Sequence, residues 1–213
     1  MNKPLMQALT LILAAAMELS GNAILAAPRS PKVKLSITVH VYNYAQIPAW
    51  TLARTQRQVA DFFLRAGIQL QWADCTPSSR NAPNPEPCAW TPAPSDLVVK
   101  IVPRFDARGE GFRNSLFGFA AGSQATIVTE RTEEIARSGE ATYPVVLGIT
   151  IAHELGHALL GPNSHSENGI MRPRFLGADF KKAQSTTLAF TPEQAEQMRH
   201  SISLRNSHPA GGK

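Results

Sequence analysis

The sequence predicts an α/β (α+β) fold built on a mixed, mostly parallel and twisted sheet, with an antiparallel edge strand, a central buried helix and a C-terminal helix. Two observations support this prediction. Early in the chain a strand pattern, a helix pattern and a second strand pattern follow one another, which is the order that joins strands in a layered domain. Further along, residues 144–160 are apolar on almost every side, as is typical of a helix inside a domain.

Hydrophobic periodicity predicts the first three elements. From 33 to 42 apolar and polar residues alternate, which indicates a strand with one buried face and places His40 on the solvent side. From 48 to 66 the apolar residues recur at intervals of three and four, and Gly67 follows them, so a helix is predicted to end there. Alternation resumes over 68–72 and predicts a second strand.

The middle of the chain predicts three more strands. The run "DLVVKIVPRF" (96–105) is nearly all apolar, as in an interior strand, and Pro103 ends it. The run "SLFGFAAGS" (115–123) is interrupted by a glycine, which suits an edge strand or a close approach of another backbone. A further strand is predicted at 125–130. The polar residues 131–142 are expected to form a solvated loop or a turn of surface helix.

The C-terminal region predicts one helix and a tail. In "FTPEQAEQMRHSISL" (190–204) Thr191 is placed as the N-cap, Pro192 at the first helical position, and Gln194 closes a capping box. Residues 206–213 are expected to be disordered.

Residues 1–26 have the composition of a secretory signal peptide. A basic start leads into an apolar run, and small residues follow it. We expect cleavage near Ala23 or Ala26, a secreted or periplasmic protein, and no stable membrane insertion afterwards. The alternative is an uncleaved anchor, which the short apolar run disfavours because a membrane span takes about 20 residues. Residues 27–205 then suffice for a single domain.

The charge of the chain argues against one class of partner. The sequence has 21 Lys and Arg and 16 Asp and Glu, which gives a net charge of +5. The basic residues are scattered and build no basic helix or aromatic-interleaved patch, so we expect no nucleic-acid partner. We interpret the charge as a contribution to solubility and expect a monomer.

Cys75 and Cys88 are the only cysteines, and the stretch between them is rich in proline. A disulfide that closes this loop suits an exported protein and would stabilise it by about 3 kcal/mol on a chain-entropy estimate. Two zinc thiolates are the alternative, but the spacing lacks the Cys-x-x-Cys pattern of zinc sites. The sequence therefore favours the disulfide.

The helix predicted over 144–160 carries a narrow polar stripe. Its strongly polar residues, Thr150, His153, Glu154 and His157, are spaced to lie on one face. Burying them without partners costs several kcal/mol, and a divalent metal ion would satisfy both histidines at this spacing. Glu154, one position off the ligand pair, would reach a metal-bound water without binding the metal itself. The alternative is two core histidines bonded to backbone groups, which leaves the glutamate unexplained.

A catalytic zinc usually has three protein ligands, and we expect the third to follow the helix. Gly161 and Pro162 end the helix, so the chain can fold back, and His165 is the first strong ligand that follows. Imidazole is the usual zinc ligand among the residue types available, which favours His165. The alternatives are Asn163, Glu167, Glu193 and Glu196.

The segment "HELGHALLGPNSHSENGIM" (153–171) resembles the zinc site of the metzincin metallopeptidases, especially the matrixin branch. The likeness lies in His-Glu-x-x-His, a third histidine shortly after it, and a methionine beyond that. It implies a zincin-like metallopeptidase domain in which His153, His157 and His165 bind one catalytic Zn²⁺ and Glu154 is the general base.

The same resemblance extends beyond the ligands. It implies that Met171 forms a methionine turn beneath the metal and that 115–123 is the edge strand that pairs with an extended substrate. The sequence departs from the family pattern in the position of the glycine after the second histidine, in a shorter interval from His165 to Met171, and in the spacing of the third ligand. The third histidine follows the second by six residues in the family, whereas here His165 follows by eight and Asn163 occupies the family position.

Taken together, these residues predict a secreted zinc-dependent endopeptidase that hydrolyses a peptide or protein substrate through a glutamate-activated, zinc-bound water. Two other functions are compatible with the ligands. One is a non-catalytic exported zinc-binding protein, in which Glu154 would be dispensable. The other is a zinc hydrolase of a non-peptide amide.

Overall fold

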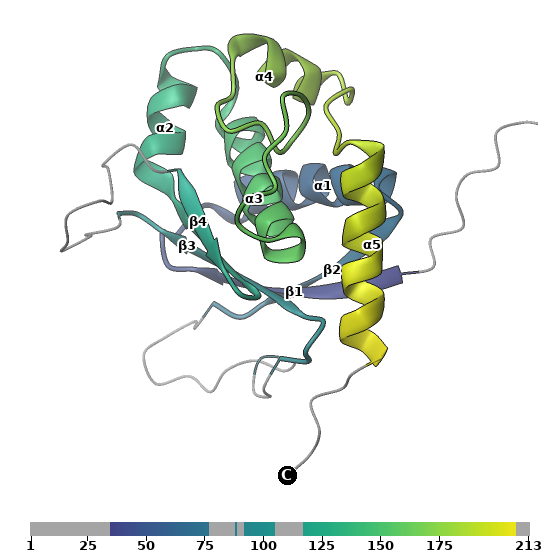
Figure 1. Ribbon diagram of the computed structural model, residues 1–213. Coiled ribbons are helices and arrows are strands. Elements are labelled where there is room, and N and C mark those ends of the chain that lie inside the picture. The colour runs from purple at the N-terminus through teal and green to yellow at the C-terminus, as the bar shows by residue number, and fades with distance from the viewer. Residues whose placement is uncertain (1–34, 77–87, 89–91, 105–116, 208–213) are drawn as a thin grey trace, which may run out of the picture. The chain divides into compact units, whose positions relative to one another are not determined.

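A five-stranded sheet forms the base of the protein in this computed structural model, which describes residues 35–76, 88, 92–104 and 117–207 (Figure 1). Neighbouring strands are parallel except at one edge, where the shortest strand runs antiparallel to its neighbour. The predicted mixed, mostly parallel sheet with an antiparallel edge strand is confirmed. The strands in spatial order are β2 (Ile68–Asp74), β1 (Leu35–Asn43), β3 (Leu97–Val102), β5 (Gln124–Val128) and β4 (Gly118–Ala121).

Helices cover one face of this sheet (Figure 1). The helix α3 (Tyr143–Leu160) lies at the centre of this layer and contacts α1 (Ala49–Arg65), α2 (Thr129–Arg137), α4 (Gly177–Gln184) and α5 (Pro192–Ser207) as well as β3, β4 and β5. Among the described helices, α3 alone is long and apolar enough to cross a membrane. Because 78% of it is buried inside the protein, it is the core helix of the domain.

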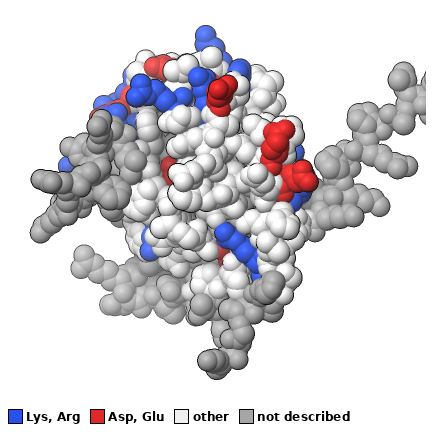
Figure 2. All heavy atoms as spheres, in the orientation of Figure 1, with Lys and Arg blue, Asp and Glu red and all other residues white. Residues whose placement is uncertain are grey.

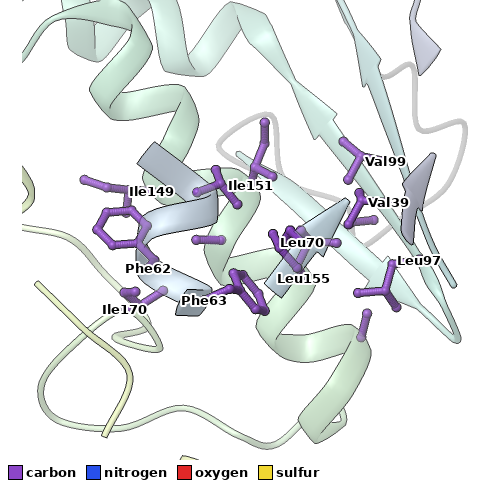
Figure 3. Packing of buried hydrophobic residues seen from close by; sticks show 14 of the residues in the cluster. Val39, Phe62, Phe63, Leu70, Leu97, Val99, Ile149, Ile151, Leu155 and Ile170 are labelled. Carbon is purple, nitrogen blue, oxygen red and sulfur yellow. The ribbon is translucent and has the colours of Figure 1, made fainter. Parts of the chain in front are cut away.

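The core lies between the helices and the sheet. Figure 3 shows Phe62 and Phe63 of α1, Ile149 and Leu155 of α3 and Val39 of β1 meeting there, and all five are fully buried. Alternate residues of β1 supply this face, as the period-two pattern predicts. Because α3 packs against four helices and three strands, both its position and its rotation are fixed, and these determine where its polar residues point.

The opposite face of β1 is also covered, and this corrects one prediction. His40 was expected to face solvent, but it is only 4% exposed. It lies beside a second, smaller cluster formed by Ala73, Cys75 and Cys88, with Tyr42 packed against it. The period-two pattern placed His40 on the correct face of β1. It did not predict that this face is buried, because Cys75 and Asp96, which contact His40, are distant in the sequence. The predicted disulfide is present, with 5.4 Å between the Cα atoms of Cys75 and Cys88.

Two helices differ from the predictions. The polar region at 131–142 was expected to be a loop or a single turn, yet α2 continues to Arg137, held by a hydrogen bond from the Thr132 hydroxyl to the Thr129 carbonyl and by an Arg131–Glu134 ion pair. The helix α4 was not predicted.

At the C-terminus the predicted capping box is confirmed. The Thr191 amide donates to Gln194 Oε1 at 3.1 Å, and the Gln194 amide donates to Thr191 Oγ1 at 3.3 Å. The helix α5 continues through Asn206 and Ser207, two residues beyond the predicted domain end. The predicted signal peptide (1–26) and the end of the tail (208–213) lie outside the described residues.

Candidate metal centre

The helix α3 supplies the first part of the candidate site. It begins after Thr142, which has an extended backbone, and it ends at Gly161, whose φ of 95° favours glycine. His153 and His157 lie one turn apart near its C-terminal end, so their rings project from the same face. The surrounding apolar residues of the helix are buried, and the polar stripe faces a cleft.

Three imidazole rings converge at this stripe. The Nε2 atom of His157 lies 3.1 Å from Nε2 of His153 and 3.1 Å from Nε2 of His165, and one ring nitrogen of each residue lies within 4.8 Å of the others. Three nitrogens around a tetrahedral zinc ion, with bonds of about 2.1 Å, would be about 3.4 Å apart. The geometry of the three rings therefore fits a common divalent ion.

Hydrogen bonds on the far side of the rings set their tautomers. The Nδ1 atom of His153 lies 2.8 Å from the Ile170 carbonyl oxygen, and Nδ1 of His157 lies 3.1 Å from the Gly161 carbonyl oxygen. A carbonyl only accepts, so each Nδ1 carries the hydrogen and each Nε2 presents a lone pair. This is the outer-shell arrangement that orients metal-binding histidines.

Burial keeps these rings neutral. It lowers the pKa of His153 to about 4, and it lowers the pKa of His157 from its ordinary value. At neutral pH the two Nε2 lone pairs therefore face each other at 3.1 Å, which is repulsive unless a cation lies between them. A metal ion removes this repulsion.

Glu154 is buried beside the histidines. Its side chain is in contact with β4, is only 6% exposed, and lines the same cleft. Burial raises the pKa of its carboxyl group to about 7. The sequence of β4 accommodates this contact, because a Cβ atom on Gly118 would lie 2.9 Å from Glu154 Cγ and 2.7 Å from the Thr126 carbonyl oxygen. The interrupting glycine thus marks a close approach, as the sequence suggested.

The chain after α3 folds back to bring His165 to the other two rings. The Ser164 hydroxyl donates to the Gly161 carbonyl oxygen at 2.7 Å, and the Ser166 amide donates to the Met171 carbonyl oxygen at 2.9 Å. A third bond comes from α5, where Gln194 Nε2 lies 3.2 Å from the Ser164 carbonyl oxygen. The eight-residue interval between the second and third histidines is therefore compatible with convergence.

Among the other residues considered as third ligands, Glu167, Glu193 and Glu196 are outside the group of mutually close ligand atoms. Asn163 is exposed, as is His165. Met171 is fully buried, and its sulfur packs against Gly156 on α3, so that a side chain there would overlap it.

The site opens into a cleft of about 1150 Å³. Residues 117–122, which include β4, line one side, and α3 with the loop to His165 lines another. The Phe175 ring lies 5.6 Å from the His153 ring, edge to face, and also lines the cleft. The face of the molecule shown in Figure 2 has a largely uncharged centre, and Lys and Arg side chains gather along its upper edge.

Two contacts at this site were not predicted from the sequence. Arg172 lines the cleft and forms a 3.1 Å ion pair with Asp179 of α4, a residue that is almost completely buried. Gln194 was recognised as a helix cap, and its bond to the loop before His165 was not. The Asp179 side chain also accepts the Leu176 amide at 2.8 Å, so an aspartate three residues into α4 was the available signal for that helix.

Comparisons with known proteins give similarity to solved structures only. No family model matches the chain, and no curated protein matches it. The archaemetzincin of Methanopyrus kandleri has a TM-score of 0.48 and 16% sequence identity, and the likeness covers 83% of this chain and 98% of that one. A zinc-dependent peptidase of Methanocorpusculum labreanum (strain Z) also has a TM-score of 0.48, with 13% identity over 76% of this chain and 99% of its own.

Proposed function

We propose that this protein is a zinc-dependent endopeptidase that is secreted or periplasmic. The observation that carries the proposal is the convergence of three histidine nitrogens, one on a buried ring and one on a half-buried ring, beside a buried glutamate in an open cleft. Export is supported by the composition of residues 1–26 and by the disulfide, because disulfides persist in oxidising compartments.

His153, His157 and His165 would hold one Zn²⁺ in this proposal. Three neutral imidazoles are a common ligand set for a catalytic zinc, and they leave a coordination position for water or substrate. A zinc ion there would supply Lewis acidity toward a carbonyl group and would make a water molecule more acidic. The bonds from both Nδ1 atoms to backbone carbonyls would keep the rings aimed at the ion.

Glu154 would be the proton carrier. In the metal-free protein burial raises its pKa to about 7, so this carboxyl group takes up a proton more readily than an exposed glutamate does. In peptide hydrolysis it would take a proton from the attacking water and deliver it to the departing amine nitrogen. Its contact with Gly118 of β4 restricts where the carboxyl group can go, which favours a single reactive position.

The substrate would be an extended peptide or protein segment. The strand β4 is at the edge of the sheet, and residues 117–122 line the cleft that holds the histidines. An edge strand can bind an extended chain through main-chain hydrogen bonds, which would place successive carbonyl groups along the cleft.

The substitution Glu154→Gln tests this function. Gln keeps the size of the side chain and cannot accept the proton, so hydrolysis of casein or a peptide library should fall by about 10²–10⁴-fold while zinc content stays at one per chain. Glu167→Gln is the matched control, because Glu167 is exposed and outside the ligand group, and its rate should be unchanged.

The same experiment distinguishes the other functions. If zinc binds but no peptide is cleaved, and Glu154→Gln changes nothing, the protein is a zinc-binding protein without peptidase activity. If the protein cleaves no peptide but cleaves a non-peptide amide, and Glu154→Gln abolishes that cleavage, the protein is a zinc hydrolase and the proposed peptide substrate is wrong. If correctly folded protein takes up no zinc, the proposal fails entirely.

A further inference from the structure

A second group of ligand-type side chains lies on the opposite face of the sheet. In the register of the strands His40 on β1 is opposite Ala73 on β2 and Val98 on β3. Cys75 follows β2 directly, and its amide donates to the Val41 carbonyl oxygen at 2.8 Å. Asp96 immediately precedes β3. Three adjacent parallel strands therefore bring a histidine, an aspartate and the disulfide to one place.

The His40 ring is held in one orientation by Asp96. Its Nε2 atom lies 3.1 Å from Asp96 Oδ2, and the same oxygen accepts the Ala93 amide at 2.9 Å. A carboxylate only accepts hydrogen bonds, so in the neutral ring Nε2 carries the hydrogen and Nδ1 has the lone pair. An aspartate that orients a histidine in this way is a common outer-shell partner of metal-binding histidines.

The lone pair of His40 Nδ1 faces sulfur. Cys75 Sγ is 3.5 Å away, and a disulfide sulfur carries no hydrogen to donate. The ring is 4% exposed, so water has little access to it. In the oxidised protein Cys75 thus gives this nitrogen no hydrogen-bond donor, whereas a thiol or a metal ion in its place would satisfy it.

The distances match a metal site. Bonds of about 2.3 Å to sulfur and about 2.1 Å to nitrogen at a tetrahedral angle place sulfur and nitrogen about 3.6 Å apart, and two sulfurs about 3.8 Å apart. The Cys75 Sγ to His40 Nδ1 distance is already 3.5 Å, and one ligand atom each of His40, Cys75 and Cys88 lies within 4.8 Å of the others. The separation of the two bonded sulfurs has to grow.

We propose that the reduced protein binds a zinc-class divalent cation at this second site through the two sulfurs and His40 Nδ1, with Asp96 as a positioning residue. A dithiol reductant would transfer two electrons and two protons to the disulfide, yielding two thiols and a disulfide on the reductant. Cation binding then releases both thiol protons, so two thiolates and a neutral imidazole face the ion. Exchange with a small-molecule disulfide, which takes up the two electrons and, with two protons, becomes two thiols, restores the protein disulfide and releases the cation. This site is independent of the cleft and of the proposed peptidase function.

Cobalt binding to the full-length protein tests this site directly. The protein is stripped with a chelator, reduced with a phosphine, which leaves no competing dithiol, and titrated with Co²⁺. A near-ultraviolet sulfur-to-cobalt charge-transfer band should grow to saturation at one thiolate-bound cobalt per chain, and Zn²⁺ should abolish it. The band should be absent from the oxidised protein. Cobalt bound by the histidines of the cleft adds no such band, because that group contains no sulfur.

Variants then assign the ligands. Cys88→Ser should abolish the band, and Asp96→Asn should retain it while weakening cobalt affinity about 10–100-fold. His200→Gln, at an exposed histidine, is the matched control and should bind as the parent does. The proposal is overturned if the folded, reduced protein gives no band, or if Asp96→Asn and His40→Gln both bind as tightly as the parent. Circular dichroism follows the fold throughout, and loss of the sheet on reduction also overturns the proposal, because the strands assemble the site.

Discussion

Gln194 on α5 donates a hydrogen bond of 3.2 Å from Nε2 to the carbonyl oxygen of Ser164, the residue before His165. The other end of the same amide, Oε1, accepts the Thr191 amide at 3.1 Å in the capping box. One side chain, only 7% exposed, therefore fixes both the start of a helix and the loop that returns the third imidazole to the cleft. Through this residue the C-terminal helix takes part in positioning the candidate metal centre.

The substitution Gln194→Glu separates these two roles. Glutamate still accepts the Thr191 amide, since it is an ordinary capping-box residue, but it cannot donate to the Ser164 carbonyl. Losing this hydrogen bond, and placing a buried carboxylate oxygen beside the Ser164 carbonyl instead, should lower the free energy of unfolding of the metal-free protein by about 1–3 kcal/mol and weaken zinc binding about two- to tenfold, measured by competition with a chelator. Thr191→Ala is the control, because it should cost about 1 kcal/mol of stability and leave zinc affinity alone. Equal zinc affinity for Gln194→Glu and the parent would refute the positioning role.

Replacing His165 or Asn163 identifies the third ligand. His165→Ala removes a converging nitrogen and should weaken zinc binding by more than the roughly 10–100-fold that loss of an outer-shell partner costs. Asn163→Ala changes an exposed side chain in the same turn and should have no effect. Zinc titrations of both variants decide the point. If Asn163→Ala weakens zinc binding and His165→Ala does not, the turn rearranges on zinc binding and Asn163 supplies the third ligand.

Periodicity made most of the fold and part of the site predictable. The period-two strands and the period-3.6 helices are local patterns, and the structure has them where the patterns lie. The polar stripe on α3 was visible for the same reason, because His153, Glu154 and His157 occupy one face of one helix. The sequence predicted that another part of the chain comes close to Gly118, but it did not identify Glu154 as the residue there.

What escaped prediction depends on segments distant in sequence. His40 has a polar position in an alternating strand, and nothing local indicates that the disulfide and Asp96 cover it. Gln194 and Ser164 are 30 residues apart. The sequence therefore predicts the local capping box of Gln194 but not its hydrogen bond to Ser164. The helix α4 is short, and its N-cap is Leu176 rather than the usual Ser, Thr, Asp or Asn.

Glu154 and His153 should give the metal-free protein opposing pH dependences. The pKa of Glu154 is raised to about 7, so its contribution to stability is present below about 4.5 and is lost as pH rises toward 7. The pKa of His153 is lowered to about 4, so its contribution is present above 6.5 and is lost as pH falls toward 4. Between these limits the effects of Glu154 and His153 on the free energy of unfolding oppose each other and partly cancel.

The variant Glu154→Gln removes one of these two effects. Without the carboxyl group, only the histidine contribution remains, so the stability of the metal-free variant should rise more steeply with pH between about 4 and 6.5 than that of the parent. Urea denaturation at a series of pH values measures this. The explanation fails if both proteins have the same slope.

Gly156 and Met171 provide a test of the packing that supports α3. Replacing a helical glycine by alanine ordinarily stabilises a helix by about 1 kcal/mol. At Gly156 the added methyl group would overlap the sulfur of Met171, which is fully buried and packed in the core, and it would lie 3.1 Å from the Phe190 ring. Overpacking of this kind costs about 1–3 kcal/mol, so Gly156→Ala should be net neutral to destabilising rather than stabilising.

Gly148→Ala in the same helix is the matched control for this substitution. There the nearest atom is 2.9 Å away at the end of the flexible Gln58 side chain, which can move, so the gain in helix propensity should persist. Met171→Ala alone should cost about 2–5 kcal/mol as a core truncation, and it should cost less in the Gly156→Ala background because the smaller side chain makes room for the methyl group. Chemical denaturation of the four proteins in this cycle gives the coupling energy. Strict additivity would show that Met171 does not press on Gly156, and the support of the histidine-bearing helix would then have to lie with other core contacts.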